Sequence, residues 1–239
     1  MSSNSICCEN NKYPQCKLDY SQLEHAKVLL LGEGNFSFAA GLARKHKTDK
    51  LNCSNILATS FDSEKEVYQK YKEAKIFINT FKSLGGKVMY NVDARDIQAS
   101  LPGQQSCFDC IIFNFPHNGT KYTGKKSVQQ KWNSEHRLLI SQFLLSAKPL
   151  LKNGGEIHLS TFHCGGKFTQ NGQDNGCGVE KAGRNAGLIH VSHEPFIPPL
   201  GYSIVDTTVG STNSNIIKMM KRIANRKTTH TIFVKKGTW

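Results

Sequence analysis

Short apolar runs alternate with longer amphipathic segments along the chain. Apolar runs bounded by glycine, asparagine or charged residues predict buried strands, and apolar residues three or four positions apart predict helices. The predicted strands are residues 28–31, 55–60, 87–92, 107–115, 156–161, 202–208 and 229–235. The predicted helices are residues 37–47, 64–84 and 135–151, with a basic helix-like stretch at residues 216–223. This alternation predicts an α/β fold with a doubly wound, mostly parallel sheet and two closing strands.

The N-terminal end and one internal segment lack any regular period. Residues 1–24 are polar and predict a flexible N-terminal tail, which is followed by one domain over residues 25–239. Within that domain, residues 164–187 are rich in Gly, Asn, Gln and Lys and predict a mobile loop or insertion. A chain of 239 residues can bury one sizeable core, and nothing in it demands a second.

Residues 28–43 form the stretch around which the rest of the chain is organised. A buried strand runs into Gly32 and Gly34, and Asn35 or Ser37 is then the expected cap of a helix. Glycine lets the backbone approach a ligand closely, and the helix start offers unpaired N–H groups. In a doubly wound sheet this turn holds the nucleotide part of a cofactor. The third glycine of the dinucleotide fingerprint is absent, and two glycines also suit a tight turn without a ligand.

Two acidic residues come directly after predicted strands. Asp62 follows the second strand, where a carboxylate can bind ribose hydroxyls, and Asp93 has the same placement after the third. The alternative for Asp62 is that Asp62 or Ser63 caps the next helix, and the alternative for Asp93 is an ordinary turn. The interval of about 28 residues from Gly34 to Asp62 exceeds the roughly 20 typical of dinucleotide sites.

The fourth predicted strand stops abruptly in the sequence N-F-P-H-N-G. Asn114, Pro116 and His117 place an amide, a proline and an imidazole at the carboxyl end of a strand, where open α/β sheets bind ligands. Asn114 and the carbonyls near Pro116 can accept a hydrogen bond from a ring N–H, and His117 can act as a base or a donor near neutral pH.

The charge of the chain favours an anionic partner. The formal net charge is +13, and the basic residues 120–131 contain Tyr122 and precede Trp132. Basic residues mixed with aromatic ones suit phosphate contact and base stacking, although a plain hydrophilic loop is the alternative. No apolar run approaches membrane-spanning length and no secretory signal is present. We therefore expect a soluble intracellular protein whose partner is RNA, without membrane contact.

The eight cysteines predict neither a disulfide framework nor a metal site. An intracellular protein keeps its thiols reduced. Cys107 and Cys110 lie on opposite faces of a predicted strand, and Cys7, Cys8 and Cys16 have no partner at a zinc-finger spacing. No bound metal is therefore expected.

Four motifs stand in order along the chain: L-L-L-G-E-G-N-F-S-F, A-T-S-F-D-S-E, N-V-D-A and I-I-F-N-F-P-H-N-G. Together they resemble the eukaryotic family of ribosomal RNA uridine-N3 methyltransferases and their relatives, including a domain joined to a ferredoxin-fold anticodon-binding module in some animal proteins. The resemblance covers residues 27–161. It implies a Rossmann-like class I methyltransferase fold, S-adenosyl-L-methionine as methyl donor, and N3 of a uridine in large-subunit rRNA as target.

The resemblance also implies roles for individual residues. The cofactor-binding set is Gly32, Glu33, Gly34, Asn35, Phe36, Asp62 and Asp93. Within this set the first three would line the methionine and ribose end, Asp62 would take the ribose hydroxyls, and Asp93 would lie by the adenine. The catalytic set is Asn114, Pro116 and His117, which with Phe115 would hold the target base. His117 or Asp93 is a hypothetical base for the N3 proton.

The C-terminal third departs from the family pattern. After the fifth strand we expect an aromatic, tryptophan-bearing helix, and residues 164–187 occupy its place. No anticodon-binding module is expected after Trp239. The alternatives are a degenerate methyltransferase fold acting as an RNA-binding or ribosome-assembly module, a nicotinamide oxidoreductase, or a small-molecule methyltransferase, which would leave the charge unexplained. The family and the basic residues 218–227 predict nuclear or nucleolar residence, with the cytoplasm as the alternative.

Overall fold

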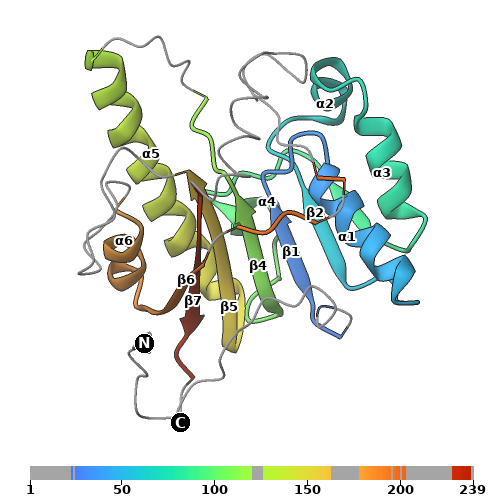
Figure 1. The fold of residues 1–239 in the computed structure, drawn as a ribbon. Coiled ribbons are helices and arrows are strands. Elements are labelled where there is room, and N and C mark those ends of the chain that lie inside the picture. Colours follow the sequence, from blue (N-terminus) through green and yellow to red (C-terminus); the bar gives the residue numbers. More distant parts are fainter. Residues whose placement is uncertain are drawn as a thin grey trace, which may run out of the picture.

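A seven-stranded sheet forms the centre of the protein in a computed structural model, which describes residues 23, 25–119, 126–162, 178–194, 196–199, 201–202 and 228–237 (Figure 1). Its strands are β1 (Val28–Leu31), β2 (Ile56–Thr59), β3 (Lys87–Met89), β4 (Phe108–Asn114), β5 (Leu151–Phe162), β6 (Leu188–Glu194) and β7 (Thr228–Lys235). The order across the sheet is β3-β2-β1-β4-β5-β7-β6, and β7 is antiparallel to both of its neighbours. The predicted mostly parallel sheet is confirmed, and its seventh strand is antiparallel, as the class I methyltransferase fold implied by the resemblance requires.

Helices cover both faces of this sheet (Figure 1). One face carries α1 (Ser37–Thr48), α2 (Glu64–Lys70) and α3 (Ala74–Lys82), and the other carries α4 (Ile97–Ser100), α5 (Lys126–Ala147) and α6 (Val179–Asn185). Strand side chains alternate between the faces, so Ile112 is buried on the α1 side and Ile111 on the α5 side. Each face therefore has its own apolar core. No helix within the described ranges is long and apolar enough to cross a membrane.

The cysteines of β4 and its approach behave as the strand period predicts. Cys110 is buried in the α1-side core, whereas Cys107 packs against the α5-side core. Both are free thiols, as is Cys53, whose burial raises its pKa to about 11. Cys7, Cys8, Cys16 and the remaining two cysteines lie outside the described residues.

The single helix predicted over residues 64–84 is wrong, because the structure divides it into α2 and α3. Tyr71 takes an extended backbone conformation directly after α2, and its side chain is completely buried in the α1-side core. Burial of this ring turns the chain inward, and Glu73 then begins α3.

Boundaries around the fourth and fifth strands also differ from the prediction. Helix α5 begins at Lys126, before the start of the helix predicted over residues 135–151. A 3-10 turn, η2 (Lys148–Leu150), follows its end. Strand β5 then starts five residues earlier than predicted. Its residues 152–155 bulge out between two pairs with β4, Phe108 with Leu151 and Cys110 with Glu156. Asn153, Gly154 and Gly155, predicted to close a helix, therefore lie within a strand.

The sixth strand of the described sheet is β6, which the sequence pattern did not predict. Tyr202 lies in no strand, and residues 203–208 are outside the described part of the chain. The α6 helix occupies a part of the segment predicted as a mobile loop. The sequence pattern hides β6 because this edge strand is rich in His and Ser and carries a β-bulge, which breaks the period of two. Of the predicted tail, residues 1–24, only Leu23 is described. The basic stretches at residues 216–223 and 218–227 also lie outside the described residues.

Candidate active site

The carboxyl ends of β1, β2 and β4 meet at one edge of the sheet. Parallel pairing aligns Leu30 with Ala58 and Leu31 with Phe113, so the turns after these strands leave the same edge (Figure 1). The strand order reverses between β1 and β4, which is where open α/β sheets bind ligands. The structure therefore brings the candidate cofactor residues and the candidate base-binding residues to one edge.

Gly32, the first residue after β1, has a reason to be glycine that involves no ligand. Its φ is +66°, a conformation that other residues adopt only at a cost. A Cβ at this position would also overlap the ring of Phe113 on β4. The Phe113 ring is itself held edge-on against Phe143 of α5, with ring centroids 5.0 Å apart. The backbone conformation and the packing against Phe113 thus favour glycine here without any ligand.

The chain then passes through Asn35 and Phe36 into α1. Phe36 occupies the N-cap position and, unusually for a bulky residue, is left-handed, with φ +63°. Such a conformation costs about 1–2 kcal/mol. The capping oxygen comes instead from Asn35, whose Oδ1 accepts a 3.1 Å hydrogen bond from the Ser37 N–H. The Phe36 ring is fully buried, 6.0 Å from Tyr90, so its side chain belongs to the core.

Glu33 lies between the two glycines as a buried acid. Its backbone N–H donates to the Thr59 carbonyl of β2 at 2.8 Å, and its carboxyl group accepts from the Ala39 N–H in the first turn of α1 at 3.5 Å. Burial raises the pKa of Glu33 to about 8, against the smaller effect of the Ala39 hydrogen bond. Glu33 is therefore mostly protonated at neutral pH and would gain charge if a cation approached.

Asp62 follows β2 as predicted, but its carboxylate already has a partner. The Lys70 ammonium donates to Oδ1 at 2.6 Å, and the Asp62 side chain is 16% exposed. The helix cap that was the alternative role belongs to Ser63, which forms a complete capping box with Glu66. Asp62 is thus not needed as a cap, and Oδ2 is the oxygen left for other contacts.

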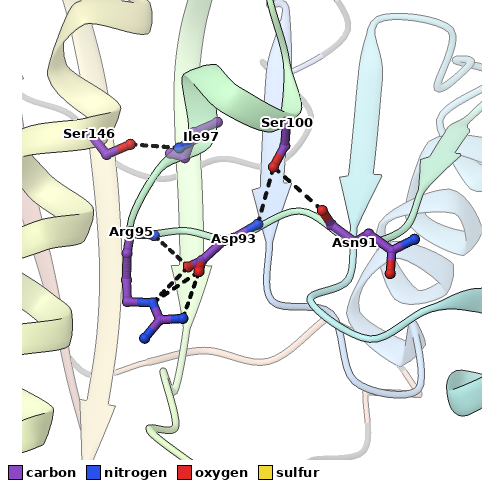
Figure 2. Close-up of polar contacts among 6 residues, drawn as sticks. All are labelled: Asn91, Asp93, Arg95, Ile97, Ser100 and Ser146. Atoms are coloured by element: carbon purple, nitrogen blue, oxygen red, sulfur yellow. Dashed lines mark hydrogen bonds and ion pairs between the residues drawn. The ribbon is translucent and has the colours of Figure 1, made fainter.

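Asp93 is held by Arg95, two residues further on (Figure 2). The guanidinium donates to both carboxylate oxygens, at 2.6 Å and 2.9–3.0 Å, and the Arg95 N–H adds a further 2.9 Å bond. These hydrogen bonds lower the pKa of Asp93. The hydroxyl of Ser100 joins the loop from the other side, between the Asp93 N–H and the Asn91 carbonyl. Asp93 is therefore a fixed anion and a poor proton acceptor.

Phe61 was missed by the sequence analysis. Its ring is 60% exposed directly before Asp62, and the Arg95 guanidinium lies 5.9 Å from its centroid. An exposed phenyl ring beside two carboxylates can stack on a flat heterocycle. The signal was an apolar residue between the end of a strand and a helix cap, a place where nothing in the fold requires burial.

At the end of β4, Asn114 belongs to a chain of buried hydrogen bonds that crosses to β5 and β7. Ser160 Oγ donates to Asn114 Oδ1 at 2.7 Å and lies 2.8 Å from His230 Nδ1. His230 Nε2 is 2.9 Å from His158 Nδ1, and His158 Nε2 is 2.9 Å from Glu156 Oε2. Burial, helped by His158, lowers the pKa of His230 to about 3, so His230 is neutral near pH 7.

The donors in this chain all point toward Asn114. Because the Ser160 hydrogen is given to Asn114, His230 must donate from Nδ1, and its bare Nε2 must accept from His158. The amide oxygen of Asn114 is thereby engaged, and its amide nitrogen, a donor, faces the opposite way. Oδ1 keeps a second lone pair, so the expected role of Asn114 as an acceptor stays a prediction beside this donor.

His117 is in a turn that fixes its tautomer. The Gly119 N–H donates to His117 Nδ1 at 3.0 Å, so a neutral His117 carries its proton on Nε2 and presents a donor. Asn118 binds the turn to α5 through the Trp132 carbonyl and Glu135, at 3.3 and 3.4 Å. Pro116 is buried. The turn is thus attached to α5, and Tyr122 falls outside the described residues.

His136 is a second residue that sequence reasoning missed. It is 4% exposed and stacks on Trp132, with ring centroids 4.6 Å apart and planes 12° apart. Burial, and secondarily the charge of His117, lowers its pKa to about 4. Its sequence signal, one histidine in an amphipathic helix, is indistinguishable from that of a surface residue.

Aromatic rings connect the two halves of the edge. Phe115 has a left-handed backbone, with φ +52°, and its ring lies edge-on to Phe196 at 5.0 Å. Phe196 also packs on Phe38 of α1 and on Tyr202, at 6.4 and 5.6 Å. The first turn of α1 and the turn after β4 are thus braced by one aromatic cluster.

Known proteins resemble this chain over most of its length. The profile of the BMT5-like family, described as rRNA (uridine-N3-)-methyltransferase BTM5-like, matches residues 29–200. An uncharacterized protein of Arabidopsis thaliana is 36% identical over 162 residues, which cover 68% of this chain and 72% of that protein. The Mus musculus homolog of ferredoxin-fold anticodon-binding domain-containing protein 1 is 33% identical over 135 residues, 56% of this chain but 19% of that protein.

A solved structure adds the fold. The crystal structure of the [4+2]-cyclase SpnF matches this chain with a TM-score of 0.50 at 12% identity. The match covers 89% of this chain and 75% of the SpnF chain, and it shows the fold alone. The sheet order, the family profile and the first relative agree with the resemblance that the four motifs indicated. The chain belongs to the BMT5-like family of rRNA (uridine-N3-)-methyltransferases and has the Rossmann-like fold expected of it.

Proposed function

We propose that this protein is an S-adenosylmethionine-dependent RNA methyltransferase that modifies N3 of a uridine in large-subunit rRNA. The observation that carries the proposal is the arrangement at one sheet edge, where the glycine turn and acids after β1 and β2 meet the Asn114–His117 turn after β4. Family membership supports the reaction class.

The residues at this edge fit a nucleoside-containing cofactor. Asp62 Oδ2 suits ribose hydroxyls, and the exposed ring of Phe61 suits a purine. The turn at Gly32 and Glu33 would hold the methionine end. When bound, S-adenosylmethionine supplies an electrophilic methyl group, so the protein needs mainly to align the ring nitrogen.

The target side favours a uracil through its donors. In uracil, N3 lies between two carbonyl groups, both hydrogen-bond acceptors. The amide nitrogen of Asn114 and Nε2 of a neutral His117 are both donors, given the hydrogen bonds that engage Asn114 Oδ1 and His117 Nδ1. Cytosine would place an amino donor on one side of N3 and lose one of these bonds.

The same donors bear on the N3 proton. Hydrogen bonds to the flanking oxygens stabilise the deprotonated imide, whose charge is shared by both oxygens. Neither expected base is well prepared, since Arg95 holds Asp93 and His117 presents a donor. We therefore propose that solvent accepts the proton. If so, removing His117 lowers the rate without moving the pH profile to lower pH.

RNA would approach over the first half of α5. Trp132 and the Lys131–Glu135 ion pair, 3.7 Å long, lie there, and Asn118 ties this part of α5 to the target turn. The net charge of +13 supports a polyanionic substrate. Nucleolar residence belongs to this proposal, and localisation of the tagged chain tests it.

A second candidate is a degenerate methyltransferase fold that binds RNA without a cofactor. The observation that favours it is that Lys70 and Arg95 already pair with Asp62 and Asp93, the two acids expected at the cofactor. In a degenerate site such internal ion pairs would replace the ligand.

Calorimetric titration with S-adenosylmethionine separates the two. The active-site proposal expects saturable binding that Asp62→Ala weakens by about 10-fold or more, as loss of one charge-assisted pair would. The matched control is Asp49→Ala, which removes an exposed carboxylate paired with Lys45 on α1 and should bind as the wild type does. No binding by the wild type would contradict the proposal and favour the degenerate module. Mass spectrometry of large-subunit rRNA from cells without the protein then tests for a missing 3-methyluridine.

A further inference from the structure

Three potential metal ligands gather at the β6 edge of the sheet, on the α5 side. Glu180 extends from α6, and His190 and His193 lie on the edge strand β6. One ligand atom from each of the three residues lies within 4.8 Å of the other two. None of them takes part in the candidate active site.

A β-bulge brings the two histidines together. Residues three apart on a regular strand point to opposite faces. Here His190 pairs with Phe233 and His193 with Thr231, so three steps along β6 match two steps along β7. The extra residue turns both imidazoles to one face, with ring centroids 4.2 Å apart. Bulges of this kind commonly re-aim side chains at functional sites.

His190 presents a bare ring nitrogen to this cluster. Its Nε2 is buried and has no hydrogen-bond partner among the described residues. The Ser192 backbone is a hydrogen-bond partner of the ring, and this bond must therefore involve Nδ1. A buried imidazole nitrogen without a partner is costly unless something binds it.

His193 and Glu180 complete the set. Thr231 Oγ1 lies 3.0 Å from His193 Nδ1, and His193 Nε2 is 2.7 Å from Glu180 Oε1. Both rings thus have Nδ1 in contact with a neighbouring hydrogen-bond partner, which leaves Nε2 as the ligand atom, as in histidine metal ligands whose other ring nitrogen is held by a hydrogen bond. The one cation near Glu180 among the described residues is Arg184, 3.5 Å from Oε2, and its side chain is 63% exposed.

We propose that Glu180, His190 and His193 form a divalent transition-metal site, with Zn²⁺ as the preferred ion and water as a further ligand. Two histidines and a carboxylate are a known zinc ligand set. Bonds of about 2.0–2.1 Å around a tetrahedral ion place ligand atoms roughly 3.3 Å apart. To reach this separation, the Glu180–His193 contact must widen from 2.7 Å by roughly 0.6 Å, and the other ligand atoms must move closer together. The ion ties α6 to the edge of the sheet. This inference does not depend on the proposed function.

The test is zinc binding by the full chain after stripping with a chelator. Metal analysis should find one equivalent of zinc fewer in His190→Ala, and calorimetry should find the affinity of that site lowered at least about 100-fold, more than loss of a residue that only holds a ligand in place would cost. His190→Ala leaves the Glu180–His193 hydrogen bond intact, so it is the variant expected to keep its fold. Zinc should raise the thermal midpoint of the wild type and not that of His190→Ala.

Two controls separate this site from other ligands. Arg184→Ala removes the neighbouring cation and should bind zinc as tightly as the wild type or more tightly. A variant with Cys7, Cys8 and Cys16 changed to Ser should keep the equivalent that His190→Ala loses. Unchanged stoichiometry and affinity in His190→Ala, or no zinc binding by the wild type, would overturn the proposal and leave Glu180 and His193 as a plain ion pair.

Discussion

Ser160 donates a 2.7 Å hydrogen bond to the side-chain oxygen of Asn114, from the directly paired position on the neighbouring strand. Ser160 is completely buried, and behind it His230, His158 and Glu156 continue the chain toward the opposite edge of the sheet. An asparagine amide alone can rotate by half a turn and exchange donor for acceptor. In the orientation found, the buried hydroxyl donates to the amide oxygen, so Asn114 presents its amide nitrogen, and loss of the hydroxyl would free the amide to rotate.

Replacing Ser160 by Ala should therefore impair target recognition more than cofactor binding. We expect kcat/KM for RNA to fall by about 10-fold, since one oriented hydrogen bond is worth about 1–2 kcal/mol, with unchanged affinity for S-adenosylmethionine. Stability should fall by about 1–3 kcal/mol because His230 Nδ1 loses its partner. Ser83→Ala, which removes a hydroxyl bonded to Thr80 on α3, is the matched control. Equal losses of cofactor and RNA binding would mean that Ser160 is only structural.

Gly32→Ala should destabilise the protein even without a cofactor. The added Cβ meets the Phe113 ring, and φ +66° is unfavourable for alanine, so we expect a loss of roughly 2–4 kcal/mol in denaturant unfolding. The double variant Gly32→Ala/Phe113→Leu separates the causes. It should recover the steric part, giving a favourable coupling of at least about 0.5 kcal/mol. Strictly additive effects would show that the backbone conformation alone explains the glycine.

Much of the fold could be predicted because the buried strands are short apolar runs. Residues 28–31 are all buried, and their pattern predicted β1 to the residue. Strand β6 could not be found in this way, since four of its seven positions are polar and its bulge breaks the period. The division between α2 and α3 was equally hidden, because burial of Tyr71 is decided by tertiary packing and not by its neighbours in sequence.

For the candidate site, sequence reasoning found the positions but not their partners. Asp62 and Asp93 do follow β2 and β3, yet their ion pairs with Lys70 and Arg95 depend on how the next segments fold back. The direction of the Asn114 amide depends on Ser160 and His230, which are distant in sequence. Such contacts leave no local pattern. The roles of these residues with a cofactor remain predictions.

Glu33 should make the protein less stable as the pH rises. Its pKa is about 8 in the folded protein against 4.5 as the ordinary value, so folding is favoured by its protonated form. That stabilisation is complete below pH 4.5 and is lost as the pH rises through 8. The free energy of unfolding of Glu33→Gln, measured with urea, should therefore rise relative to that of the wild type by up to roughly 4 kcal/mol between pH 5 and pH 9. A constant difference between the two proteins would contradict the raised pKa.

Binding of S-adenosylmethionine should release a proton from Glu33 at pH 7. The cofactor carries cationic groups, and a cation near a buried acid favours its ionised form. Calorimetry in two buffers with different ionisation enthalpies should give different binding enthalpies for the wild type and the same value for Glu33→Gln. A buffer-independent enthalpy in the wild type would place the positive groups of the cofactor away from Glu33.

His136 should have the opposite effect, at the acid end. Its pKa is lowered to about 4 by burial, so the folded state favours the neutral ring, and the stabilisation present above pH 6.5 is lost as the pH falls through 4. His136→Phe keeps an aromatic ring against Trp132 without a group that titrates. The free energy of unfolding of the variant, measured with urea, should rise relative to that of the wild type by roughly 2–3 kcal/mol as the pH falls from 7.5 to 4.5. His230 titrates alike in both proteins and cancels from this comparison. An unchanged difference would mean that His136 is hydrated in solution, and that the α5 surface beside the target turn opens to water.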